Sequence, residues 1–224
     1  MKILLATESF YPAVDSTTTT LKATADRLID TGHHVRIVAP GPGLSSYRGC
    51  AVVRVRPLEP ASAQVREAIN SFSPDLVQVH SPRNVGRRAL KHASRAGIAT
   101  LMVEQSPVLD LAADYWRTKL AGRADRVLVT SPWMVRRAAD LGVEATCWEP
   151  GVDALAFTPT LRDPWLHTSW SKAKAKSGGK VVVGHVGGLH RANGVRRLVE
   201  LGDVPGIRLV VIGDGPERAW LARR

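Results

Sequence analysis

The sequence contains few cysteines and no recognisable metal-binding spacing. Cys50 and Cys147 are far apart in the chain, with no CxxC pair and no Cys/His cluster. Neither a disulfide framework nor a structural zinc site is therefore expected. The histidines are scattered without HxxxH spacing, and no paired carboxylates accompany them. We expect no metal, no cofactor and a reducing, cytoplasmic setting.

Long apolar runs are also missing. The chain begins with Met1, Lys2 and the short segment "ILLA", which is too short for the apolar core of a signal peptide. No stretch of 18 apolar residues occurs anywhere in the sequence. We therefore expect no segment that spans a membrane.

Several catalytic motifs are absent as well. The sequence has no GxSxG, no GxxxxGK[ST], and no GxGxxG after its first predicted strand. These absences argue against a serine hydrolase of that type, a P-loop enzyme and a dinucleotide-binding enzyme. The net charge of +11 favours anionic partners, which include nucleic acid, anionic lipid and phosphorylated metabolites. Because no nucleic-acid recognition motif is present, we expect no nucleic-acid partner.

Apolar strands alternate with helices along the chain. The patterns predict strands at 2–6, 34–40, 51–58, 74–80, 98–105, 125–131, 180–187 and 207–213. They predict helices at 17–31, 63–72, 84–96, 109–121 and 192–202. This alternation is typical of an α/β fold with a parallel sheet covered on both faces.

A change in composition divides the chain. Residues 162–179 are polar, basic and end in glycine, as a surface linker would. We therefore predict a first domain at 1–161, a linker at 162–179 and the start of a second domain at 180–224. Two strands and one and a half helices cannot bury a doubly covered sheet alone. Either this piece docks on the first domain, or the sequence is the front part of a longer chain.

An ordered set of short motifs runs along nearly the whole sequence. The motifs are "TESFYP", "GHHVRIVAP", "YRGCAVVRV", "FSPDLVQVHSP", "ADRVLVTS", "EPGVDALAFTP", "VGHVGGL" and "VVIGDGPER". Together they resemble family-4 retaining glycosyltransferases of the GT-B type, and most closely actinobacterial GDP-mannose-dependent α-mannosyltransferases that act on lipid acceptors. The resemblance implies two Rossmann-like domains, the second incomplete here, with the acceptor on the first and the nucleotide sugar on the second. The family's closing acidic motif lies beyond residue 224, so the resemblance implies a diverged, C-terminally shortened copy.

The resemblance implies candidate residues in the first domain. Asp15 and Ser16 follow the first strand, where the family brings glycine backbone close to the donor pyrophosphate. A capping role at the following helix is an equally good interpretation of this pair. Gln105 and Ser106 occupy the position of the family's reaction centre, whereas Pro107 replaces its acidic residue. Gln105 and Ser106 are therefore the catalytic candidates.

The second domain supplies the phosphate-binding candidates. The family grips the diphosphate with an Arg and a Lys; this chain has Gly188 and Asn193 at those positions, and Arg191 lies close by. The implied donor-site residues here are Gly187, Gly188, Arg191 and Asn193. The alternative is that the two glycines only form a tight turn between strand and helix.

Other candidates lie at strand ends and on one basic helix. His80 ends a parallel strand, where ligands of open α/β sheets bind, and Ser131 ends another; we assign both to the acceptor cleft. The alternative for His80, a lone histidine, is a structural role. Helix 84–96 is rich in Arg and Lys, which is compatible with peripheral contact with an anionic membrane; the alternative is a basic face that is only solvated. The predicted function is retaining mannosyl transfer from GDP-mannose to a lipid or glycan acceptor. The alternative is a catalytically inactive relative that acts as a binding protein.

Overall fold

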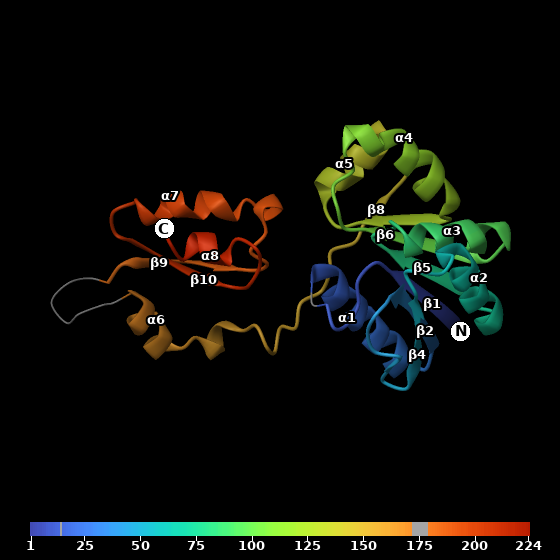
Figure 1. Cartoon of the computed structure of the whole chain (residues 1–224), viewed down its shortest axis with the longest axis horizontal. Coiled ribbons are helices and arrows are strands. Elements are labelled where there is room, and N and C mark those ends of the chain that lie inside the picture. Colours follow the sequence, from blue (N-terminus) through green and yellow to red (C-terminus); the bar gives the residue numbers. More distant parts are fainter. Residues whose placement is uncertain (14, 172–178) are drawn as a thin grey trace. The chain divides into compact units, whose positions relative to one another are not determined.

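The computed structural model describes residues 1–13, 15–171 and 179–224. Within these residues the chain divides into two compact units, Met1–Gly151 (unit 1) and Val152–Arg224 (unit 2). Figure 1 shows unit 1 from blue to yellow and unit 2 from yellow to red. Each unit is described by itself.

Unit 1 is built on an eight-stranded sheet in the order β3-β4-β2-β1-β5-β6-β7-β8. All neighbouring strands are parallel except the pair β3 and β4. The strands are β1 (Lys2–Thr7), β2 (His34–Pro40), β3 (Ser46–Tyr47), β4 (Cys50–Val55), β5 (Leu76–His80), β6 (Ala99–Glu104), β7 (Arg126–Val129) and β8 (Thr146–Cys147). The predicted α/β fold with a parallel Rossmann-like sheet is confirmed.

Short helices connect these strands. They are α1 (Ser16–Asp30), α2 (Ala61–Phe72), α3 (Val85–Arg95), the 3₁₀ helix η1 (Asp110–Ala112), α4 (Ala113–Tyr115), the π-helical segment η2 (Trp116–Leu120), the 3₁₀ helix η3 (Ala121–Arg123) and α5 (Pro132–Asp140). Among the described residues, no helix combines the length and the apolar character needed to cross a bilayer.

The core lies on both faces of the sheet. Side chains of β1 alternate, because successive residues of a strand point to opposite faces. Ile3 and Leu5 pack into one apolar cluster with Leu21 of α1, whereas Leu4 and Ala6 pack into the other, which holds residues of α2 and α3. Burial on both faces explains why these strands are apolar throughout.

The direction of strand addition reverses beside β1. From β1 the sheet extends through β2 and β4 on one side and through β5, β6 and β7 on the other. In open α/β sheets, ligands bind outside the carboxyl ends of the strands at such a point. The loops that follow β1, β5, β6 and β7 therefore form the expected binding edge.

Unit 2 contains the parallel pair β9 (Val181–Val186) and β10 (Ile207–Ile212), in which Val181 is opposite Ile207. Its helices are η4 (Pro159–Leu161), α6 (Pro164–Ser171), η5 (Arg191–Asn193), η6 (Val195–Leu198), α7 (Val199–Gly202) and α8 (Arg218–Leu221). Helix α6 packs against β9 and β10.

The unit boundary differs from the prediction. The division follows Gly151 instead of residue 161, and α6 lies inside the predicted linker at 162–179. Because α6 packs on the strands of unit 2, it belongs to that unit and does not behave as a linker. Linker residues 172–178 lie outside the described part of the chain.

Two predicted helices are interrupted. The helix expected at 109–121 consists of 3₁₀, α and π-helical pieces. The helix expected at 192–202 is divided between η5, η6 and α7, because Gly194 takes a left-handed conformation with φ of 70°. Helix α5 was not predicted, although Ser131 and Pro132 together are a helix-start signal.

Candidate functional site

The carboxyl edge of the unit 1 sheet gathers the candidates that the sequence indicates for this unit. Asp15 and Ser16 begin α1 after β1, and His80 is the last residue of β5. Gln105 and Ser106 follow β6, and Ser131 precedes α5 after β7. Parallel strands place their carboxyl ends at one edge, which is why residues so distant in sequence come together.

A pocket of about 350 Å³ opens at this edge. It is lined by Ser16, Thr19, Thr20, Gln105, Thr130 and Pro150, whose carbon atoms supply most of the pocket surface and whose hydroxyl and amide groups supply the rest. The hydroxyl of Thr17 donates to Oε1 of Gln105 at 3.4 Å. Nε2 of Gln105 is buried and has no hydrogen-bond partner among the described residues. The pocket therefore offers neutral donors and acceptors, as a sugar hydroxyl requires.

Two of the candidates cap helices. Oδ1 of Asp15 accepts the backbone N–H of Thr18 at 2.7 Å at the start of α1. The hydroxyl oxygen of Ser131 accepts the N–H of Met134 at 3.3 Å at the start of α5. Both side chains satisfy helix N–H groups that would otherwise lack a partner. These contacts favour the capping interpretation of Asp15, while Ser16 contributes to the pocket.

His80 is held inside the sheet edge. Its side chain has no exposed surface, and its Nε2 lies 2.8 Å from the side-chain nitrogen of Gln78, which donates to it. Nδ1 is buried without a partner among the described residues. Burial lowers the pKa of His80 to about 4, so the ring is neutral near pH 7. An imidazole without exposed surface does not reach an acceptor in this conformation.

Glu104 is a carboxylate at this edge that the sequence reasoning missed. Its side chain is 7% exposed. Its Oε1 accepts the N–H of Ser106 at 3.0 Å, and its Oε2 accepts the indole N–H of Trp116 at 3.3 Å. Burial raises the pKa of Glu104 above its ordinary value, although these hydrogen bonds act in the opposite direction. A charged residue at the end of an otherwise apolar strand was the signal that could have found it.

In unit 2 the glycine-rich turn after β9 packs backbone against backbone. Leu189 N–H donates to the carbonyl of Asp214 at 2.9 Å, and a Cβ on Gly213 would overlap the carbonyl oxygen of Gly187. Asn193 donates its amide to the carbonyl of Gly188 at 2.9 Å. These contacts favour the turn-forming interpretation of Gly187 and Gly188.

Arg191 differs from the other candidates of this turn. It begins η5 and is exposed, and its guanidinium has no hydrogen bond or ion pair among the described residues. By contrast, the nearby Arg196 is engaged, since it pairs with Glu217 at 2.6 Å and lies over the ring of Trp220. Arg191 is therefore the cation of this turn that remains available to an anion.

Comparisons with known proteins show which family the chain belongs to. The model of Glycosyltransferase Family 4 matches residues 17–154, which is more than half of the chain. The chain belongs to glycosyltransferase family 4. The match covers most of unit 1, including the pocket residues Thr19, Thr20, Gln105, Thr130 and Pro150.

Relatives of this family-4 chain carry a more specific name. It is 30% identical to a GDP-mannose-dependent alpha-mannosyltransferase of Mycolicibacterium smegmatis, over 99% of this chain and 65% of the relative. It is 27% identical to a protein of the same name from Corynebacterium glutamicum, over 99% of this chain and 59% of the relative. The chain thus spans about two thirds or less of the length of these relatives.

A solved structure supports the fold. WaaG, a glycosyltransferase involved in lipopolysaccharide biosynthesis, matches with a TM-score of 0.66 at 14% identity, over 98% of this chain and 65% of that one. At this identity the likeness concerns the fold. It agrees with the predicted GT-B type.

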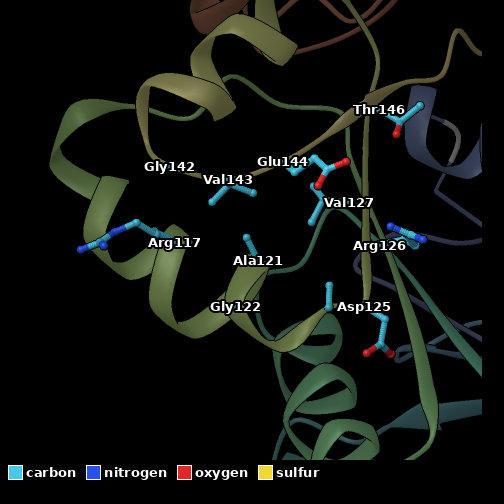
Figure 2. Close-up of a pocket in the computed structure, with 11 residues that line it drawn as sticks. Arg117, Ala121, Gly122, Asp125, Arg126, Val127, Gly142, Val143, Glu144 and Thr146 are labelled. Carbon is cyan, nitrogen blue, oxygen red and sulfur yellow. The ribbon is translucent and has the colours of Figure 1, made fainter.

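Another pocket of the family-4 chain, of about 380 Å³, lies at the opposite edge of the sheet (Figure 2). Figure 2 shows its side chains coming from η2, from the start of β7 and from the loop before β8. Asp125 and Arg126 lie at the amino end of β7, whereas all the candidate residues of unit 1 follow carboxyl ends. Since ligands of such sheets bind at the carboxyl edge, we assign no role in sugar transfer to this pocket.

Proposed function

We propose that this chain takes part in retaining transfer of mannose from GDP-mannose to a lipid or glycan acceptor. The observation that supports it best is the pocket at the carboxyl edge of the unit 1 sheet. There the amide of Gln105, whose buried nitrogen lacks a described partner, accepts the hydroxyl of Thr17 and lines the pocket with Ser16, Thr19 and Thr20 of α1. Membership of glycosyltransferase family 4 supplies the reaction class, and the named relatives supply the donor.

The proposed roles follow from charge and hydrogen bonding. Gln105 and Ser106 lie at the reaction centre, where the Gln105 amide orients a sugar hydroxyl. Arg191 attracts the diphosphate whose negative charge grows as the glycosidic bond breaks, so its guanidinium acts most strongly in the transition state. Neither role calls for a metal ion, since the cation is supplied by the protein.

The remaining candidates have supporting roles in this proposal. Ser16 offers a hydroxyl to the pocket, and Asp15 fixes the first turn of the helix that carries it. Gly187, Gly188 and Asn193 hold the backbone of the turn from which Arg191 extends. His80 and Ser131 act indirectly in this proposal. His80 accepts a hydrogen bond from Gln78 at the end of β5, and Ser131 caps α5, so both stabilise the backbone of the acceptor side.

We further propose a cytoplasmic protein that rests on the inner face of the plasma membrane. The supporting observation is helix α3, the predicted basic helix 84–96, whose arginines and lysine leave it strongly cationic. A lipid acceptor would be reached from this position. Nucleic acid is not a proposed partner.

A second candidate is a catalytically inactive relative that binds a partner. It is favoured by one specific observation, namely that the Asn193 amide is occupied by Gly188, at the position where the family resemblance implies a lysine. The lost cation weakens the expected hold on a diphosphate. Pro107, at the position of the family's acidic residue, points the same way.

Two measurements separate these candidates. Calorimetry of the folded chain with GDP and GDP-mannose tests donor binding, and the absence of heat with both ligands would exclude the transferase proposal for this chain. Transfer of radiolabelled mannose to a lipid fraction tests catalysis. Loss of that transfer in Gln105→Ala, with GDP binding retained, is the result expected of a transferase. Donor binding without any transfer by the unaltered chain would favour the inactive relative.

A further inference from the structure

The side chain of Arg54 joins two loops at the carboxyl edge of the unit 1 sheet. Arg54 lies near the end of β4, and its guanidinium donates to three backbone carbonyls. Its Nη2 donates to the carbonyl of Tyr11 at 2.5 Å, in the loop that follows β1. Its Nη1 donates to the carbonyl of Pro40 at 3.0 Å and its Nε to that of Leu44 at 2.8 Å, at the end of β2 and in the loop after it. One side chain therefore holds together the connections that follow two neighbouring strands.

The charge of Arg54 is balanced only by these carbonyls. In the part of the chain that the structure describes, no carboxylate pairs with this guanidinium. Burial lowers the pKa of Arg54, because the charged form loses contact with water. A hydrogen bond from a charged donor is stronger than a neutral one, and three of them offset the loss of hydration only while both loops stay in place. The guanidinium therefore favours one arrangement of the two loops.

The surroundings of Arg54 leave little room for another arrangement. A Cβ on Gly43 would lie 2.5 Å from Nη2 of Arg54 and 2.5 Å from the carbonyl oxygen of Tyr11. On another side, Cζ of Arg54 lies 5.7 Å from the centroid of the Phe10 ring. Phe10 is buried in the apolar cluster that also holds Leu21 of α1. The position of the guanidinium is thus coupled both to the loop after β1 and to the helix that follows it.

The loop after β1 is also held from its other side, by Glu8. Oε1 of Glu8 accepts the backbone N–H of Gly86 at 2.8 Å and that of Arg83 at 3.0 Å, around the start of α3. Helix α3 follows β5, and β5 lies beside β1 on the side opposite to β2. The loop is therefore tied to both halves of the sheet, at the point where the direction of strand addition reverses.

This loop leads into α1, which forms one wall of the Gln105 pocket. Ser16 of α1 lines that pocket, and the hydroxyl of Thr17 donates to Gln105. The hydroxyls of Ser9 in the loop and Thr18 in α1 lie 3.1 Å apart, so the loop and the first turn of the helix are bonded to each other. A movement of the loop would displace the groups that face Gln105. Displacement of reacting groups by about 1 Å can cost on the order of a hundredfold in rate.

We propose that Arg54 is a positioning residue for sugar transfer, which acts by holding the loop after β1 against the end of β2. The inference rests on the proposed function, because the Gln105 pocket is the site that it positions. Arg54 touches no reacting group in this proposal, and its effect passes through Tyr11 and the first turn of α1. The order of the loop can be measured without any substrate, so this inference and the transferase proposal can fail separately.

Arg36 offers a matched control for Arg54. Its Nη1 donates to the carbonyl of Ala68 at 3.2 Å and to the hydroxyl of Ser71 at 2.8 Å, and its Cζ lies 4.6 Å from the centroid of the Phe72 ring. Arg36 thus has the same kinds of contact as Arg54. It lies near the amino end of β2, however, and ties that strand to α2 instead of to the carboxyl edge. Loss of either arginine should lower stability, but only Arg54 should affect sugar transfer.

The first test compares Arg54→Gln with Arg36→Gln in transfer of radiolabelled mannose from GDP-mannose to a lipid fraction. We expect Arg54→Gln to lower transfer by about tenfold or more while GDP affinity, measured by calorimetry, stays unchanged. Arg36→Gln should keep most of the transfer. Arg54→Lys keeps the charge but lacks the planar fork of donors, so it should behave like Arg54→Gln. Equal transfer by the Arg54 and Arg36 variants would overturn the proposal.

A second variant serves where Arg54→Gln does not fold. In Gly43→Ala the added Cβ pushes the guanidinium away from Tyr11, while every hydrogen-bonding group is kept. Gly41→Ala is its control, because a Cβ there makes only ordinary contacts. We expect lower transfer in Gly43→Ala than in Gly41→Ala. Normal transfer by a folded Gly43→Ala would show that the contact between Arg54 and Tyr11 does not position the site.

Hydrogen exchange measures the order of the loop without substrate. The backbone amides of Ala13 and Thr19, which donate within the loop and at the start of α1, should exchange faster in Arg54→Gln than in Arg36→Gln. Unchanged exchange, or faster exchange with undiminished transfer, overturns the inference. If the unaltered chain transfers no mannose, the proposed function fails, and NMR titration with methyl α-mannoside replaces the transfer assay. Equal mannoside affinities of the two variants, or no binding even by the unaltered chain, would then overturn the role of Arg54.

Discussion

The indole N–H of Trp116 donates to Oε2 of Glu104 at 3.3 Å, while the other oxygen of that carboxylate accepts the N–H of Ser106 at 3.0 Å. Glu104 thereby ties the turn that carries Gln105 to the π-helical segment η2. The carboxylate is almost entirely buried, and burial raises its pKa. The turn therefore depends on a group whose charge is costly to bury.

The first prediction concerns the pH dependence that Glu104 produces. Because the folded chain holds the Glu104 proton more tightly, this carboxyl favours folding below its ordinary pKa of 4.5, and the advantage is lost as the pH rises through the raised value. We expect the free energy of unfolding of Glu104→Gln to increase relative to that of the unaltered chain as the pH rises toward neutrality. Urea denaturation between pH 4 and pH 7, roughly the span of such a titration, measures this difference.

Asp125→Asn is the control with the opposite sign. Hydrogen bonds from the backbone N–H and the hydroxyl of Thr100 hold the pKa of Asp125 below its ordinary value. Its stabilisation is present above that ordinary pKa and is lost as the pH falls through the lowered value. The relative stability of Asp125→Asn should therefore decline as the pH rises in the acid range. The same direction in both variants would contradict the account of Glu104.

The second prediction concerns His80. Because burial lowers its pKa to about 4, the unfolded chain takes up this proton first, and stability falls as the pH drops from about 6.5 toward 4. A shift of this size corresponds to about 3 kcal/mol. His80→Gln keeps an acceptor for Gln78 and should lose most of that acid sensitivity, as measured by denaturation at pH 7 and pH 4. A ring resonance of His80 that titrates near neutral pH would show that this prediction is wrong.

The third prediction tests Arg191. A hydrogen bond to a charged group contributes about 1.5–3 kcal/mol, so Arg191→Gln should weaken GDP binding by about tenfold or more in calorimetry. Arg197→Gln is the matched control, because Arg197 is also exposed and lies close in sequence. Equal affinities of the two variants would remove Arg191 from the donor site.

The fourth prediction tests the close backbone contact between Gly187 and Gly213 in unit 2. A Cβ at Gly213 would overlap the carbonyl oxygen of Gly187, and Gly213 has a φ of 155°. Gly213→Ala should therefore destabilise unit 2 by about 1–3 kcal/mol, seen as faster hydrogen exchange of the β9 and β10 amides. Gly184→Ala is the control, since a Cβ there meets nothing within 4 Å. If the β9 and β10 amides of Gly213→Ala exchange no faster than those of Gly184→Ala, the close contact between Gly187 and Gly213 is not needed for the turn.

Much of the fold of unit 1 could be predicted from the sequence. Apolar runs such as residues 2–6 and 74–80 indicate strands buried on both faces, and the alternation with helices indicates parallel pairing. The ends of elements and the interrupted helices were less predictable. A left-handed Gly194 and the π-helical turn at Trp116 arise from local backbone geometry that apolar periodicity does not record.

The candidate site was only partly predictable. Gln105 was identified through the family resemblance, and the structure places it in a pocket with Ser16. Glu104 was missed although a charged residue ends an otherwise apolar strand, because the sequence does not show that this carboxylate is buried and accepts the indole N–H of Trp116. His80 was expected in the cleft, but its ring is buried, and the sequence does not distinguish an edge residue that faces inward from one that faces solvent.

The sequence alone determined the order of strands and helices, the excess of cations and the membership of a glycosyltransferase family, because these depend on residue type and spacing along the chain. Only the tertiary structure decided which of those residues share a surface. One groove of unit 1 is lined by α3 and by residues about thirty positions later, and the Gln105 pocket joins α1 to the ends of β6 and β7. Packing on the parallel sheet brings these distant residues together, and no local pattern in the sequence specifies which side chains then face each other.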